Sequence, residues 1–568
     1  MTCRDRILSN EYADLVVNFI LPEEYEYDRP TDTCRHVINE DLQVYYINRG
    51  LIPELRYASS SYSFVPKCYG LMQIQSGTNL NTLSLSDAGI LSAQRPPLEL
   101  TGKNVVIAFI DTGIRYQDTV FRDATGNSRI LAIWDQTIQT GNLPDGFEYG
   151  SEYTQENINE ALRSDNPLQV VPSTDTNGHG SKMAAIAAGS SIENGSFLGA
   201  APDSQIVVVK LKEVKPYIRE YYKIPNGVPC YGETDVLLAL AYLQKFVKIL
   251  QRPMVVCLGI GTSTGDHAGS GSLETYIDLL SRKKSQVYVI GGGNEGNASH
   301  HFHGEITTRE TYKDVQLRVD DNEQGFIMDL WGEAPYSYNV TVRTPGGEGI
   351  QSINPRSTQP QEFTFVFEKT RIIIEYFWVE QTSGAQLIRF RFTDPTPGVW
   401  NIRVSAAGDV SAGIFDIWLP ITQFLSSATY FLESNPQITI TEPAYARGAI
   451  TVANYQSAND SIAPSSGRGY ARDGFIVPDI AAPGVNVSTP FGSASGTSIS
   501  AAITAGGCAQ LLEWAVVRQN DVFVNSTDIK NYLIRGANRE AYLEYPNREW
   551  GYGSLDVSGV FEFFANLG

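Results

Sequence analysis

The chain has 568 residues, a formal net charge of −20 at pH 7 and 42% hydrophobic residues. At roughly 100–200 residues per domain, this length predicts about three domains, and the apolar content excludes a disordered chain. The acidic balance argues against nucleic acid or anionic lipid as a partner, because both require a cationic surface. No apolar run approaches the roughly 18 residues of a membrane span, so we expect no transmembrane segment.

The first segment, residues 1–94, is predicted to form a separate α+β unit. Apolar stretches at 16–21, 44–47 and 63–66 favour short strands. The unit ends at Gln94-Arg95-Pro96-Pro97, because two prolines cannot continue a helix or a central strand. Acidic side chains interrupt the apolar N-terminus, so we expect neither a secretory signal nor a transit peptide.

A different pattern covers residues 95–298 and returns over residues 441–568. Uninterrupted apolar runs are typical of strands that are buried on both faces of a parallel sheet. Such runs lie at 105–110, 206–209, 254–258, 287–290 and 450–453, and helical patterns lie at 182–189, 233–250, 272–283 and 498–519. This succession predicts an α/β fold, a parallel sheet with flanking helices.

Residues 299–440 lack a convincing helical pattern and are predicted to form an all-β module of sandwich or jelly-roll type. Short β-branched or aromatic runs separated by turn residues lie at 315–319, 363–367, 372–377, 387–392 and 399–404. Because the α/β pattern resumes after it, the module is inserted into the α/β domain and not appended to it.

Two features of this module have alternative interpretations. Trp331, Trp378 and Trp400 either lie in the core of the sandwich, the commoner case, or stack on sugars in a carbohydrate-binding site. The acidic residues Asp320, Asp321 and Glu323 either form a solvated turn, which we favour, or bind calcium. We therefore predict no cofactor and no metal.

The six cysteines are sparse and form no C-x-x-C pair. Cys257 and Cys508 lie within apolar patterns and are interpreted as small buried hydrophobic residues. We expect no disulfide scaffold. Without an export signal, the chain is expected to stay in the cell that makes it.

Four short motifs carry candidate chemistry. Asp111 begins an Asp-Thr-Gly turn at the end of a buried strand, the edge where α/β folds place catalytic groups. His179 lies between two glycines, just before an alanine-rich helix. Each alone is equally consistent with an ordinary turn. The single Asp-Thr-Gly excludes an aspartic protease, which requires two carboxylates.

Ser498 begins a long apolar helix after Gly496, so its N–H points towards a reacting centre. Asn294 follows Gly292 and Gly293 after a strand, where its side chain can donate to an oxyanion. An N-cap serine and a simple turn are the alternatives for these two motifs.

In the order Asp111, His179, Asn294, Ser498, the motifs resemble those of subtilisin-like serine proteases, along residues 103–296 and 444–553. The resemblance implies that Ser498 is the nucleophile, His179 the general base and Asp111 its orienting carboxylate. Asn294 and the Ser498 N–H would form the oxyanion hole. Substrate binding would fall to the glycine-rich stretch after a strand and to the glycine before the oxyanion hole: Leu258, Gly259, Ile260, Gly261 and Gly292.

The N-terminal unit and the inserted β module together resemble the Csp germination proteases of clostridial spores. That resemblance implies a prodomain at 1–94 that acts as an intramolecular chaperone, is cut autocatalytically and stays bound. It also implies a protein substrate, the pro-form of a cortex-lytic hydrolase. The protein would be made in the mother cell and deposited in the cortex or coat region of the spore.

The processing site is predicted after Gln94, with the preceding residues in the active site as product. Two other functions stay open: a pseudoprotease that signals or scaffolds by binding, and a general intracellular subtilase with broad substrates. The complete Asp111, His179, Ser498 and Asn294 set argues against the first.

Overall fold

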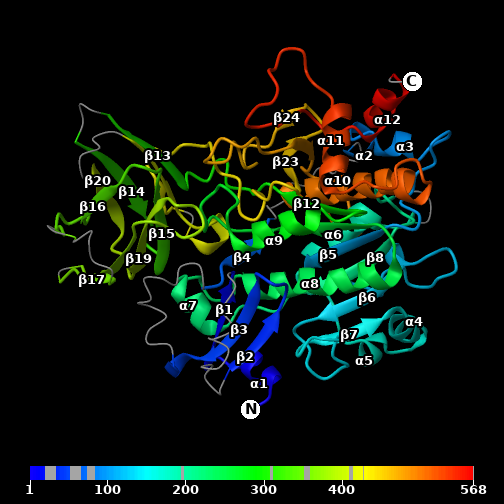
Figure 1. The fold of residues 1–568 in the computed structure, drawn as a ribbon, viewed down its shortest axis with the longest axis horizontal. Coiled ribbons are helices and arrows are strands. Elements are labelled where there is room, and N and C mark those ends of the chain that lie inside the picture. Colours follow the sequence, from blue (N-terminus) through cyan, green and yellow to red (C-terminus); the bar gives the residue numbers. More distant parts are fainter. Residues whose placement is uncertain are drawn as a thin grey trace.

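The computed structural model describes residues 1–18, 33–51, 65–72, 84–192, 197–307, 311–350, 353, 359–366, 368–407, 413–426 and 428–566. Figure 1 shows a central α/β body, a β-rich module on one side of it and a small N-terminal unit below. The predicted strands at 16–21, 63–66 and 363–367 fall partly outside the described residues.

A nine-stranded sheet, in the order β24-β23-β12-β10-β5-β8-β6-β7 with β25 beside β23, forms the centre of the α/β body. Its strands pair in parallel, except for β7 and β24 at the two edges. They are β5 (Val106–Asp111), β6 (Ile130–Asp135), β7 (Ser151–Thr154), β8 (Gln205–Lys210), β10 (Met254–Leu258), β12 (Gln286–Gly291), β23 (Ile450–Gln456), β24 (Ser461–Ile462) and β25 (Ile480–Pro483). The predicted parallel α/β sheet is confirmed.

Helices cover both faces of this sheet, because alternate side chains of each strand point to opposite faces. Ile107 and Phe109 of β5 pack on the face of α6 (His179–Ala188) and α10 (Thr497–Leu512). Val106 and Ala108 pack on the opposite face, that of α8 (Glu233–Leu250) and α9 (Ser272–Ser281). The remaining helices of the α/β body are α2 (Ser84–Asp87), α3 (Ile90–Ala93), α4 (Gln155–Arg163), α5 (Pro167–Val170), α7 (Pro216–Tyr221), α11 (Ser526–Gly536) and α12 (Val557–Ala565).

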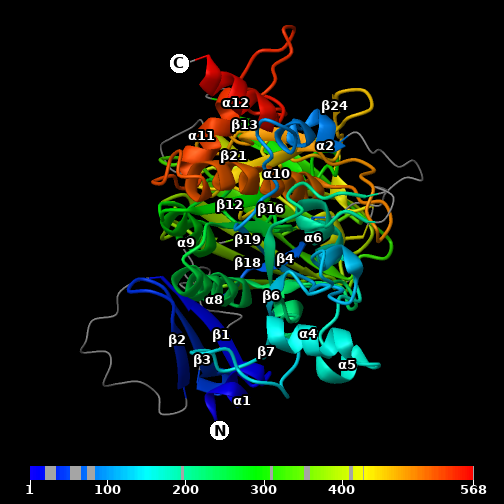
Figure 2. The same cartoon turned by 90° about the vertical axis from the view of Figure 1, so that its right-hand side faces the viewer.

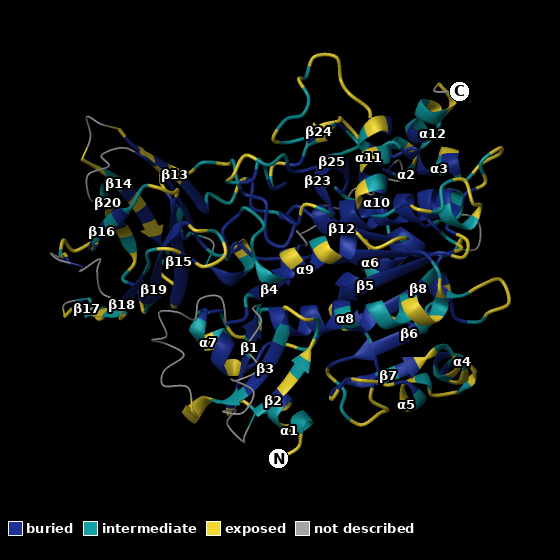
Figure 3. Ribbon diagram, in the orientation of Figure 1, coloured by how far each residue is buried: buried dark blue, intermediate teal, exposed yellow. Residues whose placement is uncertain are grey.

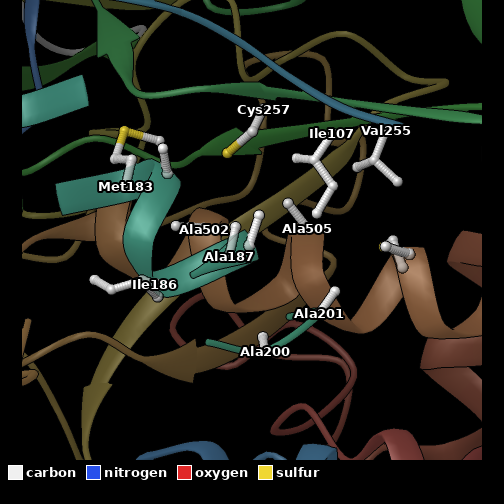
Figure 4. Packing of buried hydrophobic residues seen from close by; sticks show 14 of the residues in the cluster. Ile107, Met183, Ile186, Ala187, Ala200, Ala201, Val255, Cys257, Ala502 and Ala505 are labelled. Carbon is white, nitrogen blue, oxygen red and sulfur yellow. The ribbon is translucent and has the colours of Figure 1, made fainter. Parts of the chain in front are cut away.

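Small side chains bring α6 and α10 close to the sheet. Figure 4 shows Ala187 of α6 and Ala502 and Ala505 of α10 beneath Ile107 and Val255. Every residue of α10 is buried, and it appears dark blue in Figure 3. Within the described residues, Thr497–Val517 is long and apolar enough to cross a membrane, yet 89% of its apolar window is buried inside the protein. Packing in the core accounts for this apolar composition.

The N-terminal unit is a three-stranded antiparallel sheet with one helix. Its elements are α1 (Cys3–Leu8), β1 (Tyr12–Val17), β2 (Thr33–Val37) and β3 (Gln43–Asn48), in the strand order β1-β3-β2. Cys3 and Cys34 form a disulfide that joins α1 to β2, which the sparse cysteines did not lead us to expect. Val16, Val44 and Tyr46 share an apolar cluster with α8, and the unit lies against that helix in Figure 2.

One strand of the N-terminal region leaves this unit and enters the α/β body. β4 (Cys68–Leu71) lies between β11 (Ile260–Gly261) and β9 (Tyr231–Gly232) in an antiparallel arrangement. Residues 84–94 instead pack into the α/β core, where Ala88, Ile90 and Ala93 are buried. The chain therefore joins the α/β body before the boundary predicted at residue 94.

The inserted module consists of two antiparallel sheets that share one apolar core, as expected for a sandwich. The six-stranded sheet has the order β13-β21-β15-β19-β18-β17, and the four-stranded sheet has the order β16-β20-β14-β22. The strands are β13 (His301–Ile306), β14 (Tyr312–Val319), β15 (Gly325–Gly332), β16 (Tyr338–Arg343), β17 (Gln361–Thr364), β18 (Arg371–Phe377), β19 (Gln386–Thr393), β20 (Gly398–Ala406), β21 (Gly413–Trp418) and β22 (Tyr430–Phe431).

The structure shows how far the module's tryptophans are buried and what its acidic turn contacts. Trp331 and Trp400 are buried, which supports the core interpretation, while Trp378 is half-buried. Glu323 accepts hydrogen bonds from Ser426. Among the described residues, no group of three or more His, Cys, Asp or Glu side chains is arranged to hold a metal ion.

Candidate active site

Asp111 and His179 meet because two adjacent elements end and begin at the same edge of the sheet. Asp111 is the last residue of β5, and His179 is the first residue of α6. Gly178 before the helix has a φ of 89°, and a Cβ on Gly180 would lie 2.3 Å from the carbonyl oxygen of Gly113. Glycine is needed at both positions, one for its backbone conformation and one for the close approach of Gly113. The glycines on either side of His179 therefore allow its helix to begin beside Asp111.

The Asp111, His179 and Ser498 side chains form a continuous hydrogen-bonded chain. His179 Nδ1 lies 2.8 Å and 2.9 Å from the two Asp111 carboxylate oxygens. His179 Nε2 lies 3.0 Å from Ser498 Oγ. All three residues are at most 1% exposed. This geometry allows the imidazole to take the hydroxyl proton while the carboxylate stabilises the resulting charge.

Asp175, which no sequence motif predicts as a site residue, links the Asp111 turn to α6. Its carboxylate accepts hydrogen bonds from the Thr112 hydroxyl at 2.9 Å and the Gly178 N–H at 2.7 Å. It also accepts from the Ser181 hydroxyl at 2.7 Å. Asp175 is buried and lies two residues before Asn177, outside any motif that its type alone would indicate.

Asn294 lies beside Ser498 in an orientation suited to an oxyanion. Its side-chain oxygen accepts a hydrogen bond from the Thr497 N–H at 3.0 Å, so its NH₂ group is the part that can donate to a ligand. A cavity of about 370 Å³ borders Asn294, Gly293 and Met72. The predicted oxyanion site is therefore next to the serine hydroxyl.

A segment of the protein's own chain occupies this site. Ser498 Oγ lies 2.8 Å from the carbonyl oxygen of Met72, and the Ser498 N–H donates to the same oxygen at 3.4 Å. The Met72 N–H donates to the carbonyl oxygen of Gly259 at 2.8 Å. Residues 68–72 thus lie across the site as an extended strand ending at the serine.

Strand pairing holds the bound segment on both sides. Leu71 and Gly70 pair with Ile260 and Gly261 of β11. Cys68 and Tyr69 pair with β9 on the other side. Gly259, Ile260 and Gly261 therefore lie where the sequence predicted a strand-like substrate contact.

The Met72 side chain fills a slot that glycines leave open. A Cβ on Gly261 would lie 2.4 Å from Met72 Cε, and one on Gly291 would lie 3.0 Å from its sulfur. Thr441 lies next to both Gly261 and Gly293. The slot suits an unbranched apolar side chain. Neither Gly291 nor Thr441 had been predicted.

Two predicted binding residues have other contacts. Leu258 lies inside the sheet, in register with Ile110 and Ile290, and is buried in its core. Gly292 donates its N–H to Val452 and accepts from Thr441 through its carbonyl oxygen. Leu258 is thus a core residue, and Gly292 supports the site through its backbone.

The inserted module also reaches the bound segment. Gln423, in the turn Thr422–Phe424 after β21, accepts a hydrogen bond from the Leu71 N–H at 3.2 Å and donates one to the Leu71 carbonyl. A Cβ on Gly70 would lie 2.5 Å from Ile421 Cδ1. Gln423 lies 352 positions along the chain from Leu71, which it binds. No local sequence pattern predicts this contact.

Gln94, the predicted processing residue, is not at this site. It caps the end of α3, and its side-chain amide donates to the carbonyls of Gly199 and Ala200 at 3.2 Å and 2.9 Å. The structure places Met72 against Ser498 instead. The two prolines after Gln94 mark a turn within the α/β body.

The fold and the Asp-His-Ser geometry define a serine protease of the subtilisin class. The chain matches the subtilase family (Peptidase_S8) over residues 102–315 and 383–553, more than half of its length, and it belongs to that family.

Comparison with solved and curated proteins gives two informative relatives. The chain is similar to the CspB protease of Clostridium perfringens, with 32% identity, a TM-score of 0.75, and coverage of 86% of this chain and 98% of that one. It is also similar to the subtilisin-like protease SBT3.6 of Arabidopsis thaliana, with 25% identity over 197 residues. That match covers 28% of this chain and spans only 25% of the plant protein's length.

Proposed function

We propose that this subtilase is a self-processing endopeptidase that cuts its own chain after Met72 and keeps the N-terminal region bound as a prodomain. The observation that carries the proposal is the 2.8 Å contact between Ser498 Oγ and the Met72 carbonyl oxygen. The strand that presents Met72 runs through the substrate cleft between β11 and β9. A substrate residue that precedes a scissile bond would bind in this way, with its carbonyl group at the nucleophilic serine, and this supports the proposal.

The proposed reaction uses residues already in contact. Ser498 Oγ attacks the carbonyl carbon of Met72, and its proton passes to His179 Nε2 while Asp111 stabilises the imidazolium. The Ser498 N–H and the Asn294 amide donate to the oxyanion on Met72. The C–N bond to Gln73 then breaks as His179 protonates the leaving amine. Water hydrolyses the resulting ester and regenerates the serine.

The mass of the purified chain tests this proposal. We expect the wild-type protein to consist of two tightly associated fragments, one ending at Met72 and one beginning at Gln73. Ser498→Ala is the matched control and should remain a single chain, since it lacks the nucleophile. An uncut wild-type chain, or a cut after Gln94, contradicts the assignment of Met72.

We further propose that the substrate in trans is the pro-form of a spore cortex-lytic hydrolase, which the enzyme activates during germination. The resemblance to the Csp germination proteases, including the 32% identity to CspB over most of both chains, supports this role. The protein would be made in the mother cell and deposited in the cortex or coat region.

A reconstituted reaction tests the substrate. The wild-type protein should remove the pro-segment of a purified cortex-lytic pro-enzyme and release its peptidoglycan-cleaving activity. Ser498→Ala should do neither. A pro-enzyme that stays intact with self-processed wild-type protein contradicts the germination role but not the self-cleavage.

A further inference from the structure

Lys67, at the sixth position counted back from Met72, is fixed to the α/β body through its main chain. Its N–H donates to Glu233 Oε2 at 3.0 Å, and the Glu233 N–H donates to the Lys67 carbonyl oxygen at 2.9 Å. Glu233 is the first residue of α8, so this reciprocal pair sets Lys67 on the N-terminus of a long helix. The lysine is therefore held in register with the strand that ends at Ser498.

The Lys67 side chain extends from this anchor into an acidic chamber. Its ammonium lies 3.7 Å from Glu274 Oε2, and the lysine side chain is only 12% exposed. Glu274, Glu233 and Glu442 are all at most 3% exposed. Burial disfavours the Lys67 cation, but Glu274 and Glu442 raise the pKa of Lys67 well above its ordinary value. Burial raises the pKa of Glu233 and raises that of Glu442 well above its ordinary value, so the Lys67 charge compensates Glu274, the carboxylate that it faces at 3.7 Å.

Tyr69, at the fourth position before the end of the segment, faces the same carboxylates. Its side chain is fully buried, and its hydroxyl has no hydrogen-bond partner among the described residues. Burial raises the pKa of Tyr69, and the nearby Glu233 and Glu274 raise it further. Tyr69 is thus buried next to the chamber, in the apolar cluster that it shares with Leu273 and Tyr276 of α9.

Gly271 makes room for the lysine. Its φ of −64° is open to any residue, so backbone strain does not require glycine there. A Cβ at this position would lie 2.6 Å from Lys67 Nζ and 2.1 Å from Glu274 Oε2. The missing side chain is needed only because the ammonium and the carboxylate meet at this point.

The chamber ends at a junction of all three parts of the protein. A cavity of about 30 Å³ adjoins Lys67 and is lined by Val65 of the N-terminal region, Asp266 and Ser270 of the α/β body, and Trp331 of the inserted module. This volume holds about one water molecule. The lysine therefore ends beside a small space with room for a bound water, at the junction of the three parts of the protein.

We propose that this chamber is an extended substrate subsite that selects a lysine six residues before the scissile bond. The inference rests on the proposed function, in which Met72 precedes the cut. A substrate without a cation at this position would leave the Glu274 carboxylate buried without a counter-charge, which disfavours binding of that substrate in the register needed for cutting. The substrate class is therefore a protein segment with a lysine at the sixth position counted back from the cut.

The rate of self-cleavage of the full-length chain tests the proposed subsite. Radiolabelled wild-type, Lys67→Gln and Lys67→Glu chains are made by translation in vitro, and the cut after Met72 is followed over time. We expect Lys67→Gln to cut about 10–100-fold more slowly than wild type, and Lys67→Glu more slowly still. Lys103→Gln, the same change at an exposed lysine, is the matched control and should cut at the wild-type rate.

A Glu274→Gln background shows whether Lys67 acts in substrate recognition or only in folding of the chain. In a Glu274→Gln chain, Lys67→Gln should slow cutting by no more than about threefold, because the carboxylate it compensates is gone. An equal slowing in both backgrounds would mean that Lys67 supports folding only, and the subsite proposal would be wrong. Wild-type rates for Lys67→Gln would overturn it equally.

The failure of the proposed function gives a different result. If the wild-type chain folds but is never cut after Met72, the self-processing proposal fails and the subsite proposal fails with it. If wild type and Lys67→Gln are cut after Met72 at equal rates, only the subsite proposal fails.

Discussion

Lys215 Nζ lies 2.5 Å from Asp14 Oδ1, and both side chains are at most 5% exposed. The same ammonium donates to the carbonyl oxygens of Tyr12 and Arg6 at 2.9 Å and 3.3 Å. One lysine of the α/β body thus donates three hydrogen bonds to the N-terminal unit. Asp14 precedes Met72 in the sequence and Lys215 follows it, so this buried contact would join the two fragments after a cut at Met72.

Asp14→Asn should weaken retention of the N-terminal unit after self-cleavage. Removing one partner of a buried ion pair leaves the other charge uncompensated and costs about 3–5 kcal/mol. Size-exclusion chromatography of the cut protein should show the two fragments together in wild type and separated in Asp14→Asn. Glu11→Gln, at an exposed position of the same unit, is the control and should keep the fragments together.

Asp111→Asn should slow self-cleavage by about 10⁴-fold, the loss seen when the orienting carboxylate of a serine-protease triad becomes an amide. An amide at this position favours the wrong imidazole tautomer, although the volume is unchanged. The rate of appearance of the fragment that begins at Gln73 measures the effect. A rate within tenfold of wild type would exclude Asp111 from the triad.

Asn294→Ala should slow the same reaction by about 10²–10³-fold, because one oxyanion donor is removed. The bond from Thr497 to Asn294 is also lost, so the melting temperature of the variant must be measured in a Ser498→Ala background. Slow cutting with an unchanged melting temperature is the expected combination. Normal cutting would assign the oxyanion to other donors.

Gly70→Ala should slow self-cleavage, because the new methyl group would meet Ile421 Cδ1 at 2.5 Å. Overpacking of this kind costs about 1–3 kcal/mol, or roughly 5–150-fold in rate. Shortening the opposing side chain with Ile421→Ala should restore much of the rate in the double variant. No rescue would mean that the inserted module does not restrict this position of the substrate.

His267 predicts a pH dependence of stability. Its ring stacks on Trp418 at 3.9 Å, and burial lowers its pKa to about 3. The folded protein keeps His267 neutral, so its contribution is complete above the ordinary histidine pKa and is lost as pH falls from about 6.5 towards 3. The charged or titratable groups that influence it are Asp266, His301, Arg472, Glu442 and Tyr445.

Comparison with His267→Asn isolates this effect. Asparagine tolerates the positive φ of 53° at this position. Between pH 6 and pH 4, wild type should lose about 1.4 kcal/mol per pH unit more than the variant. Chemical denaturation at each pH measures the difference. Parallel curves for the two proteins would contradict a neutral His267 in the folded state.

The triad could be predicted from the sequence because each member lies at the end of an element with a clear pattern. Asp111 ends an uninterrupted apolar strand, His179 begins an alanine-rich helix, and Ser498 is the second residue of another. Parallel strands bring such ends to one edge of a sheet. The order of these residues along the chain, which resembles that of subtilisin-like proteases, then predicts the catalytic role of each.

The occupant of the cleft could not be predicted in this way. The turn at Gln94 gave a strong local signal, but it marks only a bend within the α/β body. The pairing of Leu71 with Ile260 is long-range and leaves no periodic trace in either segment. Gln423 bonds to Leu71 across 352 positions of the chain, and nothing local to either residue reveals the contact.

The position of β4 as the middle strand between β11 and β9 has a consequence for timing. Hydrolysis after Met72 removes one covalent bond but none of the strand pairings on either side. The cleft would then hold its own product, at the high local concentration that a docked neighbour provides. The onset of activity towards another protein would be set by how fast this strand dissociates, and not by how fast it is cut.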